Sequence, residues 1–98
     1  MTNPQRNEAS LSVDGRPRSL RLTLGALAEI EQALGAVGFS DLAERMKRLS
    51  AGDLLQVTGA LLRAAEGPEA PDPGGADIDP AEAAHAVAEV FSPGGRQG

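Results

Sequence analysis

The sequence predicts an α+β protein, in which an N-terminal two-stranded antiparallel hairpin packs on a small bundle of three to four helices. Two observations predict this fold class. Apolar and polar residues alternate with the period of a half-buried strand up to Leu22, and from Leu24 onward the apolar residues recur at helical spacing. Capping signals later in the chain indicate that further helices follow.

The length of 98 residues is that of one domain, which we expect to span 1–98. Its ordered core would comprise about 8–65 and a helix of about 79–91, with bounds uncertain by a few residues. A linker rich in proline and glycine, about 66–78, separates the two and is expected to be flexible. The polar ends of the chain are expected to be disordered tails.

The hairpin consists of two alternating stretches joined at Asp14-Gly15, a dipeptide typical of tight turns. A two-residue turn would place Leu11 opposite Arg18 and would put Pro17 in the ladder. We expect a four-residue loop instead, with Leu11 opposite Leu20, because Pro17 has no N–H to donate. We expect the apolar face to rest on the first helix, since a lone hairpin is marginal in water. In either register that face comprises Leu11, Val13, Leu20 and Leu22.

The first helix is expected from Leu24 to Leu34. Thr23 stands at the N-cap position, and Gly35 stands where a glycine commonly ends a helix. Glu31 lies at the edge of the apolar stripe of this helix. We expect its carboxylate to reach past the apolar border to water, with a partner contact or a buried ion pair as the alternatives. The stripe itself comprises Leu27, Ile30 and Leu34.

The second helix is expected to begin after Ser40, a good N-cap residue, with Phe39 packing back on the first helix. A narrow apolar seam along it comprises Leu42, Met46 and Leu49. Its basic residues are expected to form a solvated face. They are also the only basic cluster of an acidic protein and could attract an acidic partner; they are Arg45, Lys47 and Arg48.

The third helix is expected from about Ala51 to Ala65, because Ser50 and Asp53 have the spacing of a capping box. It carries two apolar stripes, whereas a surface helix usually needs one. The second stripe, Leu55 and Leu62, either packs on the hairpin or is left for a partner; we favour packing. Candidate partner-binding residues are accordingly Leu55, Leu62 and Glu31. The first stripe comprises Leu54, Val57, Leu61 and Ala65.

The fourth helix has the strongest start in the chain, since Asp79 is a cap, Pro80 suits the first helical position and Glu82 can reach back from the third. His85, the only histidine, lies beside two glutamates of this helix. A Glu-x-x-His pair resembles half of a di-metal bundle site, but the second pair is missing. We therefore expect a solvated helix face, with no catalytic, cofactor-binding or metal-binding residue and no enzyme activity.

Composition excludes several classes of function. The 14 acidic against 9 basic residues and the near absence of aromatics argue against nucleic-acid binding. Without cysteine, disulfides and thiolate sites are excluded. No apolar run approaches the roughly 20 residues of a membrane span, and the N-terminus has no signal-peptide core. We expect a cytoplasmic protein with a thin core, for which a partner or self-association would add useful burial.

The segment after Asp14-Gly15, which runs from Leu20 to Gly35 as LRLTLGALAEIEQALG, resembles the phage tail protein family of gene transfer agents and related tailed phages. Members are small proteins described as tail tube or tail assembly chaperone proteins. The similarity is strong over 13–35 and looser over 42–62. The last helix is similar to the short C-terminal helix of the family, whereas the long connector before it is less typical.

The resemblance implies a role in building a phage-like tail in the bacterial host cell. A tail assembly chaperone would coat the tape-measure protein until tube subunits polymerise around it, so the implied partners are tape-measure and tail tube proteins, with a homo-oligomer possible. One alternative is a structural tail tube component, associated with the virion. A tube ring built on sheets would need more than the two strands expected here. The other is an acidic carrier, but Ser40-Asp41 has the wrong order for its attachment motif and such carriers have no hairpin.

Overall fold

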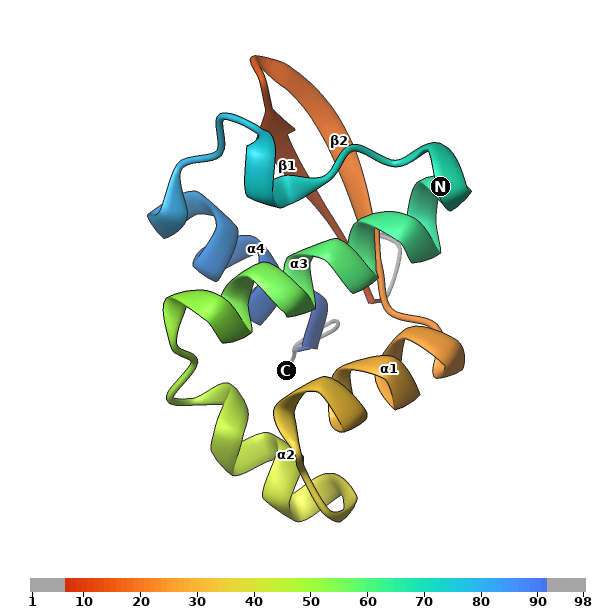
Figure 1. The fold of residues 1–98 in the computed structure, drawn as a ribbon, viewed down its shortest axis with the longest axis vertical. Helices are drawn as coiled ribbons and strands as arrows, with labels where there is room; N and C mark the ends of the chain where they lie inside the picture. The colour runs from red at the N-terminus through yellow and green to blue at the C-terminus, as the bar shows by residue number, and fades with distance from the viewer. Residues whose placement is uncertain (1–6, 92–98) are drawn as a thin grey trace, which may run out of the picture.

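The computed structural model describes residues 7–91, so the expectations for the two tails lie outside it. Two strands and four helices confirm the α+β fold class (Figure 1). The elements in order are β1 (Glu8–Val13), β2 (Arg16–Arg21), α1 (Leu24–Leu34), α2 (Gly38–Met46), α3 (Ala51–Glu66), two short 3₁₀ turns η1 (Gly67–Glu69) and η2 (Pro73–Gly75), and α4 (Pro80–Phe91).

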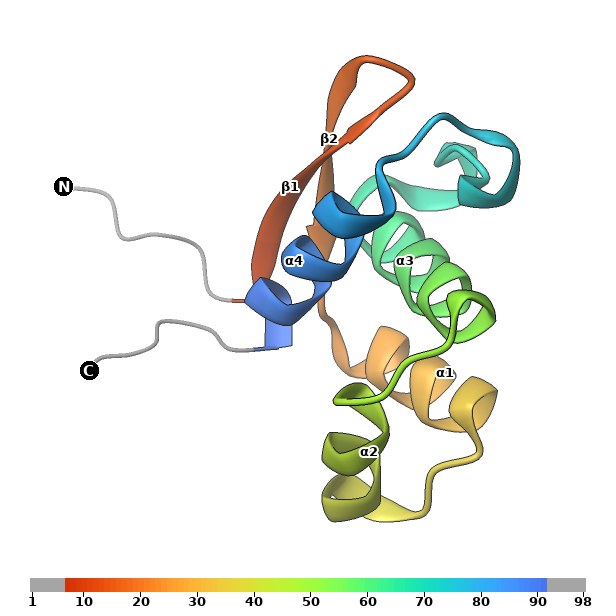
Figure 2. The same cartoon turned by 90° about the vertical axis from the view of Figure 1, so that its left-hand side faces the viewer.

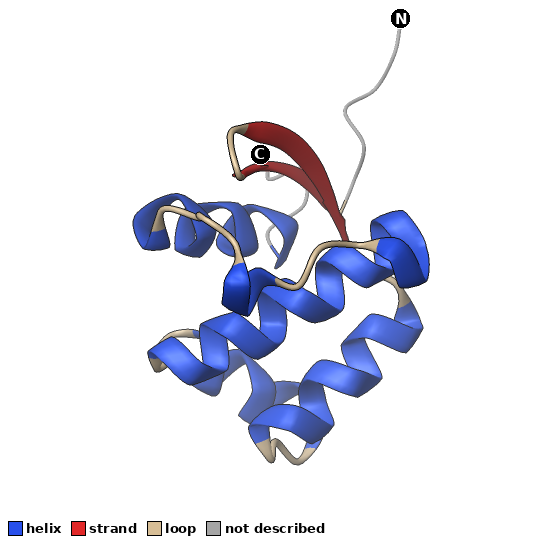
Figure 3. Cartoon of the chain, turned by 45° about the horizontal axis from the view of Figure 1, so that its top comes forward, coloured by secondary structure: helices blue, strands red, loops and turns tan. Residues whose placement is uncertain are grey.

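The hairpin rests on α3 and α4 rather than on α1. β2 lies along α3, β1 lies along α4, and α1 packs on another side of α3 (Figure 2). The expectation that the first helix supports the hairpin is therefore wrong. The reason lies in α3, whose two apolar stripes allow it to cover the hairpin and α1 at once, and Figure 3 shows the strands on one side with the helices gathered beneath them.

The turn between the strands has two residues, and the expected four-residue loop is wrong. Leu11 pairs with Arg18, and Ser12 pairs with Pro17. Asp14 and Gly15 both have positive φ, 54° and 81°, as a type I′ turn requires. The preference of Asp-Gly for a type I′ turn therefore determines the register, although it places Pro17 within the strand.

Pro17 costs the ladder nothing, because of its place in the register. In an antiparallel pair, residues that exchange hydrogen bonds alternate with residues that do not. The N–H of Ser12, opposite Pro17, points outward and donates to Glu82 Oε2 at 3.1 Å. The Ser12–Pro17 pair is therefore one of the non-bonded pairs, in which the missing N–H of proline is not needed.

The first helix has the expected bounds and caps. Thr23 Oγ1 accepts a hydrogen bond from Ala26 N at 3.0 Å, and Gly35 ends the helix in the left-handed conformation. Leu24 does not join the apolar stripe and is 80% exposed at the N-terminus of the helix. Ile30 and Leu34 are buried, with Ala26 beside them.

The second helix begins at Gly38, before the expected cap. Val37 is the N-cap residue and provides no side-chain bond, so the prediction of Ser40 as the cap is wrong. Carboxylates replace the missing cap: Asp41 Oδ2 accepts from Val37 N at 2.8 Å, and Glu31 Oε2 accepts from Gly38 N at 3.0 Å. The earlier start leaves Phe39 exposed rather than packed on α1.

The third helix carries the centre of the core. The predicted capping box is present, with Ser50 and Asp53 bonded reciprocally. Six consecutive residues around its middle, 57–62, are buried, so this part of α3 is covered on all sides. Among the described residues, the largest fully buried side chains are those of Leu11, Leu20, Ile30, Leu61, Leu62, Val13, Val57, Val87, Val90 and Thr58. Over residues 7–91, none of the helices has both the length and the apolar character of a membrane span.

Candidate partner-binding surface

The connector between α3 and α4 follows a defined path across α3. Both 3₁₀ turns contact that helix. Gly59 faces the connector, since a Cβ built there would lie 3.5 Å from Pro73 Cγ, an ordinary contact distance. At its far end the connector is tied to the hairpin turn by two reciprocal bonds, Asp14 N to Asp77 O at 3.0 Å and Asp77 N to Asp14 Oδ1 at 2.8 Å. The connector thus forms one wall beside α3.

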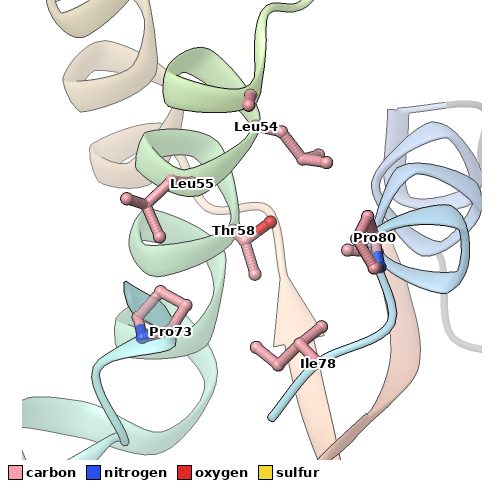
Figure 4. Close-up of a pocket in the computed structure, with 8 residues that line it drawn as sticks. Leu54, Leu55, Thr58, Pro73, Ile78 and Pro80 are labelled. Carbon is pink, nitrogen blue, oxygen red and sulfur yellow. The ribbon is translucent and has the colours of Figure 1, made fainter. Parts of the chain in front are cut away.

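A hollow of about 170 Å³ opens between the connector, the first half of α3 and the start of α4 (Figure 4). We call it the connector hollow. Its side chains point inward from three elements, and all of them except Thr58 are apolar. Leu55 is 41% exposed at its edge. The lining residues are Ala51, Leu54, Leu55, Thr58, Pro73, Ile78, Pro80 and Ala83.

A second, larger hollow of about 380 Å³ lies on the other side of Leu54. We call it the helix hollow, because it is bounded by the end of α2, the start of α3 and the second half of α4. Leu54 lines both hollows, and we call the two hollows together the α3–α4 surface. The residues lining the helix hollow are Met46, Lys47, Leu49, Leu54, Ala84, Val87, Ala88 and Phe91.

Thr58 provides the single polar side chain in the connector hollow. It is 2% exposed, and its Oγ1 has no hydrogen-bond partner among the described residues. A buried hydroxyl left without a partner costs about 1–3 kcal/mol. The hydroxyl is covered by its neighbours and has almost no exposed surface, so this cost falls on the folded chain itself.

The structure separates the three residues that the sequence put forward for partner binding. Leu55 lines the connector hollow. Leu62 is fully buried in the core, where no partner can reach it. Glu31 is half-buried and holds the α1–α2 loop through Gly38 N. The connector wall was missed because its prolines and acidic residues are also typical of a solvated linker.

The α1–α2 loop and the first turn of α2 present two exposed large apolar side chains. Val37 is 84% exposed and Phe39 is 73% exposed. The loop is fixed nonetheless, by its bonds to Glu31 and Asp41. The backbone N–H of Val37, and secondarily the Arg45 guanidinium, hold the pKa of Asp41 below its usual 3.8.

The outward N–H groups of the hairpin are occupied at two points. Ser19 N donates to Glu66 Oε2 at 3.2 Å, and Glu66 Oε1 also accepts from Arg18 Nη1 at 3.0 Å. On the other strand, Ser12 N donates to Glu82. These side chains restrict the addition of a further strand to either edge.

The two hollows are lined by apolar side chains apart from Thr58 and Lys47. Residues 7–91 contain no group of three or more histidine and acidic side chains placed to hold a metal ion. His85 lies on the exposed side of α4. The fold and the α3–α4 surface together define a small α+β domain that offers an open apolar face to another molecule.

This domain belongs to a known family. The family described as phage tail tube protein, GTA-gp10, matches residues 6–93, which is nearly the whole chain. The resemblance noted between residues 13 and 35 is thereby confirmed, and the chain is a phage tail-related protein of the gene transfer agent type. No curated protein matches the chain, and no solved structure does.

Proposed function

We propose that the chain is a tail assembly chaperone, without enzyme activity, that holds an apolar helical segment of the tape-measure protein until tube subunits polymerise. The observation that carries the proposal is the α3–α4 surface, where two apolar hollows share Leu54. Contiguous exposed apolar surface on a small domain typically marks an interaction site. Family membership supports partners among the components of a phage-like tail.

A helix is the occupant that the shape of this surface suits best. Amphipathic helices bind grooves through anchors at positions i, i+3 or i+4, and i+7, which need successive pockets in a row. The connector hollow and the helix hollow lie next to each other on either side of Leu54 and supply such a row.

The competing proposal is a structural subunit of the tail tube, which the family description itself names. A tube built on sheets needs strand edges that are free to pair between subunits. Here the sheet has two strands, and Ser12 N and Ser19 N on its outer edges are bonded to glutamates. These contacts favour the chaperone, which would act in the host cell cytoplasm.

Calorimetric titration of the purified chain with synthetic segments of the tape-measure protein from the same tail gene cluster tests the proposal. We expect Leu55→Asp to weaken binding at least tenfold, because it places a charge in the connector hollow. Gln56→Asp is the matched control, since Gln56 is an exposed neighbour that does not line either hollow. Circular dichroism establishes that both variants are folded. Equal binding by the two variants would remove this surface from the proposal.

Mass spectrometry of purified particles separates the chaperone from the tube subunit. A chaperone is released during assembly, so we expect the chain in host lysates during tail formation and only traces of it in finished particles. Many copies per particle, at the abundance of the tube, would establish the structural role instead.

A further inference from the structure

We propose that the α3–α4 surface binds its helical partner in one direction, antiparallel to α4. The bound helix carries an acidic residue in its first turn and a basic residue in its last turn. This inference rests on the proposed function, because it takes an apolar helix as the occupant of the same surface, and it adds the charge pattern and the direction of that helix. The observation that carries it is the opposite charge of the two ends of the surface.

The end formed by the helix hollow is basic. Lys47, which follows the last residue of α2, is the one charged residue that lines either hollow. Its Nζ lies 3.5 Å from Glu44 Oε2, and the two side chains are 71% and 63% exposed. Such an exposed pair contributes little, since both charges stay solvated. Lys47 is therefore available to an acidic side chain of a bound helix.

The end formed by the connector hollow is acidic. Asp72 directly precedes Pro73, which lines this hollow, and is exposed. Asp79 stands in the same relation to Pro80 and is also exposed. From residue 64 to residue 91 the chain contains no lysine or arginine. A basic side chain at this end of a bound helix would therefore meet carboxylates, and an acidic one would be repelled.

The direction of the bound helix follows from the order of these two ends along α4. The connector is at the top of Figures 1 and 2, and α2 is at the bottom. Helix α4 begins beside the connector at Pro80 and ends beside the helix hollow at Phe91. Acidic residues are favourable in the first turn of a helix and basic residues in the last. A helix of this kind matches both ends only when its N-terminus lies at Lys47, which makes it antiparallel to α4.

Calorimetric titration of the full chain with two designed helical peptides tests the direction. Both peptides carry leucine at positions i, i+4 and i+7. One has glutamate in its first turn and lysine in its last turn, and the other has the two exchanged. We expect the wild type to bind the first peptide about tenfold more tightly, because the exchange turns attraction into repulsion at both ends. Added salt should reduce this preference.

A charge reversal at the basic end shows whether the preference comes from the surface. Lys47→Glu should bring the two affinities close together. Arg48→Glu is the matched control, since it makes the same change of charge at the next residue, which lines neither hollow, and it should keep the preference. Circular dichroism establishes that both variants are folded.

Neutral variants test the acidic end. Asp72→Asn combined with Asp79→Asn should lower the preference about threefold, because one of the two charged ends is lost. Asparagine keeps an acceptor oxygen for Gly74 N and caps a helix as well as aspartate does, so this variant should fold. Glu69→Gln removes a connector carboxylate that does not adjoin a lining residue and should leave the preference unchanged.

Equal binding of the two peptides by the wild type, tighter binding of the second, or binding of neither overturns the inference. A preference that Lys47→Glu leaves unchanged belongs to the peptides themselves and also overturns it, as does an equal loss in Arg48→Glu. The proposed function is decided separately, by titration with tape-measure segments. Segments that bind through Leu55 without the charge preference would leave the function in place and remove the direction. Directional binding of the designed peptides alone would do the reverse.

Discussion

The two halves of α3 have similar sequences and different surroundings. Leu54 and Leu55 in the first half recur seven residues later as Leu61 and Leu62. The second pair is fully buried under the hairpin and α1, whereas Leu55 is 41% exposed and Leu54 lies between two hollows. The same residues at the same helical positions thus build the core at one end of the helix and an open surface at the other.

The difference shows that the neighbours of a helix, rather than its own pattern, decide which apolar residues are free for a partner. The second half of α3 is covered by β2, and Arg63 on it pairs with Glu29 of α1. The first half lies beside the connector, α4 and the end of α2, and these leave the α3–α4 surface open. The predictions below probe this contrast, beginning with the largest expected effect.

Truncating a leucine in each half should separate the two most clearly. Leu62→Ala should lower the free energy of unfolding by about 2–5 kcal/mol, because it leaves a cavity in the core. Leu55→Ala should lower it by less than about 1 kcal/mol, since a partly exposed side chain gives up little burial. Denaturant titration followed by circular dichroism measures both. Equal losses would mean that the two halves are not different in the way described.

The ion pair between Glu66, at the end of α3, and Arg18 should stabilise the packing of the second half of α3 against β2. Glu66→Ala removes the bonds to Arg18 Nη1 and Ser19 N and should cost about 1–2 kcal/mol, because charged hydrogen bonds at partly buried sites exceed exposed ones. The control is Glu44→Ala, which removes a well-exposed pair with Lys47 and should cost less than about 0.5 kcal/mol. Denaturant titration compares the two variants. An equal cost would show that the bonds from Glu66 to β2 add no more stability than an exposed ion pair does.

Thr58 lies at the middle of α3, between its half-exposed first half and its buried second half. Thr58→Val keeps the shape of the side chain and removes a buried hydroxyl without a partner, so it should raise the free energy of unfolding by about 1 kcal/mol. Thermal unfolding of the variant and of the wild type measures the difference. A destabilised variant would show that Thr58 is satisfied in solution.

The order of the α1–α2 loop should depend on pH through Asp41. The Val37 N–H and Arg45 lower the pKa of Asp41 in the folded protein below its value of 3.8 in the unfolded chain. Folding therefore favours the ionised carboxylate. The contribution is therefore present above pH 3.8 and is lost as the pH falls below it. The protection of the Val37 amide, taken as the ratio of its intrinsic to its observed exchange rate at each pH, should fall in that acid range, and Asp41→Asn should remove the step. A step of the same size in the variant would assign it to another group.

The sequence allowed much of the fold to be predicted, because local chemistry determined it. Thr23, Gly35 and the Ser50–Asp53 box act within one turn of helix, and all are where the pattern placed them. The errors arose where contacts beyond the local pattern determined the structure. The carboxylates of Asp41, in the first turn of α2, and of Glu31, in α1, accept bonds from the N–H groups at the start of α2 and allow it to begin early. The support of the hairpin by α3 depends on packing, which residue spacing does not reveal.

The candidate surface was only partly predictable for the same reason. Leu55 was identified because a second apolar stripe is unusual on a surface helix. Leu62 has the same spacing and could not be distinguished from it without the hairpin in place. The wall at Pro73 and Ile78 depends on the connector folding back on α3, and a sequence rich in proline and glycine does not specify that path.

Amide chemical shifts of the labelled protein, recorded as a tape-measure segment is added, test the central claim most directly. The account predicts that the shifts change in the first half of α3, over 51–58, and along α4, over 80–91, with the hairpin unaffected. Changes confined to the hairpin or to α1, with 51–58 unmoved, would contradict the assignment of the α3–α4 surface as the site of partner binding.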